Sequence, residues 1–241
     1  MAKKKKRKRR IQEAPAAAPT PRARQERKEA ARRERERIIR AARRRRLMTR
    51  AIRWGVVVAV LGGATAFVGY RFYEDRRLLE RAAAAADTLG CGEIQSLPSE
   101  GRGHLQQGSS PPEYGTTPAT SGPHSSSTLP SDVHAYDQAV PEPLAVHNLE
   151  HAYVIIYYRA EGNDALPENV RAALAELAQG QEKVIMAPYP DLSEGTSLAF
   201  TAWTKLQECP RVTDADKAVL AVQGFIKQFR GTSNAPEPSS A

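Results

Sequence analysis

The chain has 241 residues with 36 Lys or Arg against 27 Asp or Glu, a net charge of +9. This charge is unevenly divided, because residues 1–53 carry 23 basic and 5 acidic side chains, which leaves the rest of the chain at −9. The division excludes a uniformly basic protein, and each part of the chain must be interpreted by itself.

An uninterrupted apolar run occupies residues 54–70 and separates the basic arm from the acidic remainder. A helix of these 17 residues spans about 25 Å, slightly less than the hydrocarbon core of about 30 Å, and Arg53 and Arg71 can snorkel to the interfaces. A secretory signal peptide is the alternative, but its basic segment would be about fifty residues long and no small-x-small cleavage site precedes Arg71. The run therefore predicts a retained, single-pass transmembrane helix.

The arm at residues 1–53 contains a Lys/Arg cap (3–10), an Ala/Pro spacer (14–21) and a mixed-charge stretch (22–46). Opposite charges at helical spacing in this last stretch predict an arm that is largely disordered or partly helical. The positive-inside rule places it in the cytoplasm and the C-terminal domain outside the cell membrane. Its expected partners are anionic lipid headgroups, and nucleic acid is disfavoured because no aromatic side chain interleaves the charges.

Residues 71–90 read as a helical stalk next to the membrane, since good helix formers end at Gly90. The exported domain is expected at 91–230, followed by a disordered tail at 231–241. Gly, Ser, Thr and Pro dominate residues 96–143, so this long segment is expected to be irregular.

Regular structure is predicted after this segment. Short apolar runs predict strands at 154–158 and 183–187, and a weaker alternation predicts a third strand at 197–205. Helices are predicted at 167–179, opened by a proline, and at 214–230, capped by Asp214. The order β-α-β-β-α indicates an α+β fold, a small α/β sandwich whose first two strands are parallel.

Cys91 and Cys209 are the only cysteines, and both lie on the side predicted to be exported. In an oxidising compartment the economical interpretation is a disulfide bond, which would close a loop of more than a hundred residues. A thiol metal site or a redox pair is the alternative, although the chain has no CxxC motif.

All five histidines fall within 48 residues, at His104, His124, His134, His147 and His151. His147, Glu150 and His151 form an HxxEH pattern, which is formally the inverted zinc-protease signature. A metallopeptidase is disfavoured, because prolines upstream and a strand directly downstream leave room for two helical turns at most.

Several motifs occur in a specific order: TSGPH (120–124), Tyr136, VHNLEH (146–151), APYP (187–190), Thr-Ala-Trp (201–203) and then Cys209. In this order and spacing they resemble the bacterial family catalogued as domain of unknown function 3105, over about residues 88–230. Ser125 and Ala152 depart from the residues common in that family, and neither change removes a polar side chain. The resemblance implies a membrane-anchored exported domain and supplies no catalytic residue.

Three functional hypotheses remain open. The first is a metal site formed by His124, His147 and His151 with Glu150 as a fourth ligand, a donor set that suits a divalent transition metal such as zinc or copper. The second is a structural hydrogen-bond network in a domain that binds an unknown envelope partner. The third is acid–base or hydrolytic catalysis, and a non-enzymatic role is favoured over it because no Ser-His-Asp spacing occurs.

Two spatial expectations accompany these hypotheses. His124 should converge with His147 and His151, since both motifs border irregular chain beside a strand. His104 and His134 should be peripheral, because neither lies in a motif.

Overall fold

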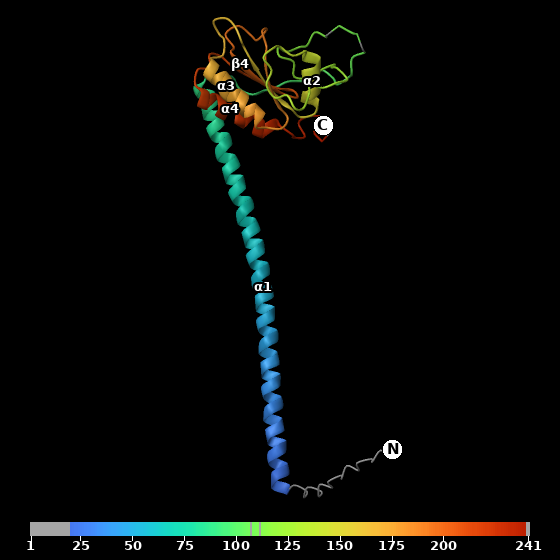
Figure 1. Ribbon diagram of the computed structural model, residues 1–241, viewed down its shortest axis with the longest axis vertical. Helices are drawn as coiled ribbons and strands as arrows, with labels where there is room; N and C mark the ends of the chain where they lie inside the picture. Colours follow the sequence, from blue (N-terminus) through green and yellow to red (C-terminus); the bar gives the residue numbers. More distant parts are fainter. Residues whose placement is uncertain (1–19, 107, 111, 240–241) are drawn as a thin grey trace, which may run out of the picture. The chain divides into compact units, whose positions relative to one another are not determined.

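The computed structural model describes residues 20–106, 108–110 and 112–239, and its chain divides into two compact units, Met1–Gly69 and Tyr70–Ala241 (Figure 1). The predicted Lys/Arg cap at 3–10 and nearly all of the predicted spacer at 14–21 lie outside the described residues.

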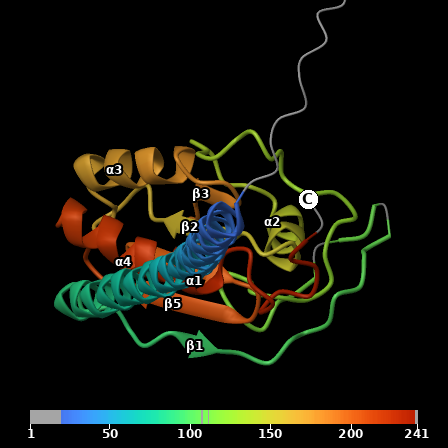
Figure 2. The same ribbon diagram turned by 90° about the horizontal axis from the view of Figure 1, so that it is seen from below.

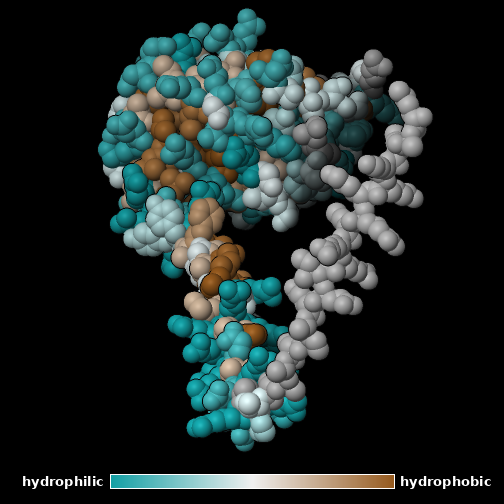
Figure 3. Space-filling model, turned by 60° about the horizontal axis from the view of Figure 1, so that its bottom comes forward, coloured by the Kyte–Doolittle hydropathy of each residue, from teal (hydrophilic) through white to brown (hydrophobic). Residues whose placement is uncertain are grey.

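Helix α1, Pro21–Thr88, runs through the predicted mixed-charge stretch, apolar run and stalk without interruption. Ion pairs between side chains four residues apart support its basic part, as between Arg32 and Glu36 at 3.7 Å. The apolar side chains of the run are exposed, with Trp54 69% and Phe67 65% accessible, and Figure 3 shows brown hydrophobic side chains on the helix surface. In the described part of the chain, this one helix is long and apolar enough to cross a membrane.

The end of α1 belongs to the folded domain, whereas the sequence predicts a separate stalk at 71–90. Ala82, Ala85 and Ala86 are buried, and Gly224 of helix α4 approaches Ala82 so closely that a Cβ there would lie 2.3 Å from that side chain. The small side chains allow the two helix backbones to come close together. Asp75 adds an ion pair of 2.8 Å with Lys227.

The domain contains one five-stranded mixed sheet in the order β1-β5-β4-β2-β3. The strands are β1 Gln95–Ser96, β2 Val154–Tyr158, β3 Val184–Pro188, β4 Leu198–Ala202 and β5 Lys205–Cys209. Strands β2 and β3 are parallel, and the other pairs are antiparallel. The α+β class agrees with the prediction, but the order β-α-β-β-α does not. Strand β1 and helix α2 precede the first predicted strand, and the third predicted strand turns back at Thr204, with φ 57°, and divides into β4 and β5.

Three further helices cover the sheet: α2 Glu142–Glu150, α3 Glu168–Gln179 and α4 Ala215–Phe229. The last two lie side by side, as Figure 2 shows, and pack on one face of the sheet through one buried cluster that includes Leu174 and Phe225. A second buried cluster on the opposite face contains Val146 and Leu149 of α2. Both faces are covered, which explains why every side chain of β2, β3 and β4 is buried.

Two further connections close the domain. A disulfide bond joins Cys91, just after α1, to Cys209 at the end of β5. Residues 231–239 differ from the predicted disordered tail, since Gly231 donates to the carbonyl of Ala152 at 2.9 Å and Ala235 is only 5% exposed. The tail therefore packs against the second cluster.

Candidate metal centre

Short backbone pairing inside the irregular segment brings two histidines together. His104 and His124 form a parallel bridge, with the amide of His124 donating to Gly103 at 3.0 Å and the amide of Leu105 donating to His124 at 2.7 Å. The two imidazole rings consequently lie 5.1 Å apart between centroids. The irregular segment is thus ordered by strand-like contacts that are too short to leave a sequence pattern.

Gly122 explains the conformation of the TSGPH motif. Its φ of +122° is rare for residues with a side chain, and a Cβ there would lie 3.0 Å from the ring of Tyr114. Its amide donates to the carbonyl of Gly101, and its own carbonyl lies 2.8 Å from Nδ1 of His124. Since a carbonyl only accepts, this Nδ1 carries a proton, and Nε2 is the atom that the ring presents to the centre.

Helix α2 supplies the other side of the centre from the VHNLEH motif. His147 and Glu150 lie three residues apart and hence on one face of the helix, while Val146 and Leu149 face the sheet and are fully buried. Asn148 fixes the neighbouring loop, since its Oδ1 accepts from the amide of Leu129 at 2.8 Å.

Four side chains converge where these segments meet: His104, His124, His147 and Glu150. One ligand atom from each lies within 4.8 Å of the corresponding atoms of the others. His124 is fully buried, Glu150 is 3% exposed and His147 is 7% exposed, while His104 is exposed and closes the outer side. The cluster is thus buried at its base and open to solvent at one ligand.

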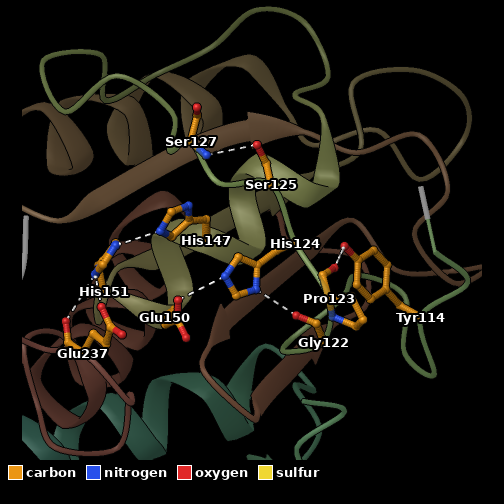
Figure 4. A network of polar contacts seen from close by, with 10 residues as sticks. All are labelled: Tyr114, Gly122, Pro123, His124, Ser125, Ser127, His147, Glu150, His151 and Glu237. Atoms are coloured by element: carbon orange, nitrogen blue, oxygen red, sulfur yellow. Dashed lines mark hydrogen bonds and ion pairs between the residues drawn. The ribbon is translucent and has the colours of Figure 1, made fainter. Parts of the chain in front are cut away.

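Figure 4 shows a direct contact between His124 and Glu150, with Nε2 3.0 Å from Oε2. With the ring proton on Nδ1, the lone pair of a neutral His124 faces a carboxylate oxygen. Two facing lone pairs repel each other in a buried site unless a proton or a metal cation lies between them. This geometry therefore requires a cation or a proton at one defined position.

The environment of His147 disfavours the protonated, charged form of its ring. Burial and the neighbouring rings of His124 and His151 lower its pKa below the ordinary value, while the backbone of Ser127 acts weakly in the opposite direction. Its Nδ1 is buried and has no hydrogen-bond partner in the part of the chain that the structure describes. Figure 4 shows this nitrogen turned toward the segment of Ser125 and Ser127, with Nε2 turned toward His151. A neutral ring suits metal ligation.

His151 lies beside the group of four rather than in it. Its Nε2 is 2.9 Å from Nε2 of His147, and its Nδ1 is 3.3 Å from the backbone carbonyl of Glu237 (Figure 4). The side chain thus contacts a ligand residue on one side and the C-terminal tail on the other.

The sequence-based site and the observed cluster differ at one position. Of the four predicted ligands, the structure brings together His124, His147 and Glu150, and it places His151 next to them. His104 takes the remaining position, which corrects the expectation that it is peripheral. His134 lies apart from the cluster, with Nδ1 2.9 Å from the carbonyl of Val184.

The chain also matches the model of a known protein family. Residues 105–241 match the family model described as "Protein of unknown function (DUF3105)", and the chain belongs to this family. The matched region contains three of the four clustered side chains and begins one residue after His104. No curated protein and no solved structure is similar enough to the chain to count as a match.

Proposed function

We propose that this member of the DUF3105 family is a membrane-anchored, extracytoplasmic protein that binds a divalent transition metal through His104, His124, His147 and Glu150. The observation that carries the proposal is the convergence of four ligand atoms within 4.8 Å, three of them from buried residues. Three imidazoles and one carboxylate form a donor set that zinc and copper both accept.

The distances agree with one shared ion. Zinc bonds to imidazole nitrogen and carboxylate oxygen are about 2.0–2.2 Å long, so two ligands of a tetrahedral ion lie about 3.3 Å apart. Nε2 of His124 and Oε2 of Glu150, at 3.0 Å, are already close to that separation. A cation between them would also remove the repulsion between their lone pairs.

The surroundings of the ligands support the same proposal. Metal-binding histidines usually donate their second ring N–H to a backbone carbonyl, as His124 does to Gly122. For His147, coordination through Nε2 would replace the contact of this atom with His151 and place the ring proton on Nδ1, which has no hydrogen-bond partner among the described residues. Metal binding would thereby direct a donor toward the backbone of Ser127.

The membrane part of the proposal rests on the apolar segment of α1 and on the charge distribution around it. Basic residues concentrate before this segment and acidic residues after it, which favours a cytoplasmic N-terminus and an exported domain. The basic arm would contact anionic lipid headgroups, and the exported surface would bind an envelope partner.

Metal content of the full-length protein, purified in detergent without a His tag, tests the metal site. Zinc or copper should be retained at one equivalent per chain. The His124→Ala variant should lose it, while the His134→Ala variant, which removes a histidine outside the cluster, should not. Protein that stays metal-free after incubation with either ion would contradict the proposal.

Fluorescence separates the two candidate metals. The ring of Trp203 lies 6.3 Å from the ring of His124, so bound copper(II) should quench its emission and zinc should not. Trp54 is the only other tryptophan, and a Trp54→Phe background isolates the signal.

A structural hydrogen-bond network is the second candidate. It is favoured by the His124–Glu150 contact, which connects the irregular segment to α2, and by the His147–His151 contact at the end of α2, since neither contact needs an ion. In that case His124→Ala lowers the melting temperature and no variant changes metal content.

A further inference from the structure

The C-terminal segment that follows α4 contacts the end of α2 beside the proposed metal centre. Gly231 donates to the carbonyl of Ala152 at 2.9 Å, and the amide of Glu237 donates to the carbonyl of Glu150 at 3.0 Å. Both acceptors belong to the end of α2 or directly follow it. Residues 231–238 therefore hold the segment that carries the carboxylate ligand.

The same segment also reaches the support of His124. Asn234 donates through Nδ2 to the carbonyl of Trp203 at 2.6 Å, and Ala235 belongs to the same buried cluster as Trp203. The indole of Trp203 meets the ring of His124 edge to face at 6.3 Å. Residues 231–238 thus connect the two halves of the centre, one on α2 and one on the irregular segment.

Lys183 binds the C-terminal end of residues 231–238. Its Nζ donates to the carbonyl of His151 at 3.1 Å and to the carbonyl of Pro238 at 3.0 Å, so one ammonium group bridges the end of α2 and the tail. The carbonyl of Glu237 in turn lies 3.3 Å from Nδ1 of His151. Contacts with Glu150, His151 and Lys183 therefore hold the tail at the C-terminal end of α2.

We infer that residues 231–238 form a positioning strap that sets the geometry, and hence the affinity, of the proposed metal centre. The strap contributes none of the four ligand atoms. It acts through the backbone of Glu150, the ring of His151 and the indole of Trp203. Groups that orient ligands in this way typically change metal affinity by about 10–100-fold when they are removed. The inference rests on the proposed function, because it concerns the same centre.

Two truncations of the full-length protein test the strap. A chain that ends at Ala235 loses the contacts of Glu237 and Pro238 but keeps the buried Ala235 and the bond of Asn234. We expect its zinc dissociation constant, measured by competition with a chromophoric chelator, to rise about 10–100-fold. A chain that ends at Pro238 lacks only the last three residues and should bind zinc like the wild type.

A third variant, Lys183→Met, keeps the full chain and removes the ammonium bridge, and it should weaken zinc binding in the same direction. Melting temperatures of the metal-free proteins separate positioning from stability. A merely structural strap would lower these temperatures and leave the dissociation constant, measured well below the transition, unchanged. Unchanged affinity in both the Ala235 truncation and Lys183→Met would overturn the strap alone. Failure of the wild type to bind zinc or copper would instead overturn the proposed function.

Discussion

The ring of His104 lies 5.1 Å from that of His124 and 5.2 Å from that of His147, although His104 belongs to no recognisable motif. Its place depends on backbone pairing with His124. Solvent can reach His104, which is exposed, while the other three side chains of the proposed centre are buried. An ion could therefore enter and leave past His104 without opening the core.

Replacement of single histidines distinguishes the observed ligand set from the set suggested by HxxEH. His104→Ala should weaken zinc binding, because it removes a ligand, whereas His151→Ala should retain one zinc per chain, because His151 lies outside the group of four. Isothermal titration with zinc measures both. The reverse result, loss of zinc only in His151→Ala, would assign the fourth position to His151.

Glu150 tests the role of charge in the centre. Glu150→Gln keeps the shape of the side chain but removes the anion that would face the metal and His124, so zinc affinity should fall by at least about 100-fold, the upper end of what loss of an orienting group costs. Glu194→Gln is the matched control, since its exposed carboxylate lies outside the group of four and outside residues 231–238. Equal affinities of the two variants would show that the carboxylate is not a ligand.

Much of the fold follows from local patterns in the sequence. The strands β2 and β3, the helix α3 and the cap of α4 agree with the predictions, because each depends on apolar spacing or on one capping residue: the amide of Lys217 does donate to Asp214, at 3.0 Å. The sequence predicts one strand where the structure has β4 and β5, because the turn at Thr204 contains no Gly, Pro or Asn to mark it. Strand β1 has only two residues and forms solely by pairing with β5.

The candidate site depends in part on contacts that leave no local pattern in the sequence. His124 stands in the TSGPH motif, and His147 and Glu150 stand in the VHNLEH motif. The short distance between the motifs along the chain predicts convergence, and the structure brings the three side chains together. His104 depends on a pairing between parts of an irregular segment that has no periodicity to reveal it. The sequence predicts a disordered tail at 231–241, whereas the tail is ordered by contacts with distant carbonyl groups.

The lowered pKa of His147 predicts a pH dependence of the metal-free domain. Because the folded protein holds this ring neutral where the unfolded chain would protonate it, protonation favours unfolding. The stability conferred by the neutral ring is present above the ordinary value of about 6.5 and is lost as the pH falls below it. Thermal unfolding in chelator between about pH 7.5 and 5 should show this decline, and His147→Gln should reduce it. Parallel profiles for both proteins would contradict this assignment.

The disulfide bond should be a major source of stability for the domain. Cys91 and Cys209 are 118 residues apart and connect the end of α1 to β5, so the bond restricts a large loop in the unfolded chain. The chain-entropy model gives about 4–5 kcal/mol for a loop of this size. The double replacement Cys91→Ser and Cys209→Ser should therefore lower the free energy of unfolding by an amount of this order in urea titrations of the full chain.

Wild-type protein isolated from its native compartment should show one linked peptide pair on non-reducing mapping. Two freely alkylated cysteines there would contradict the bond, and an unchanged unfolding free energy in the serine variant would contradict its role.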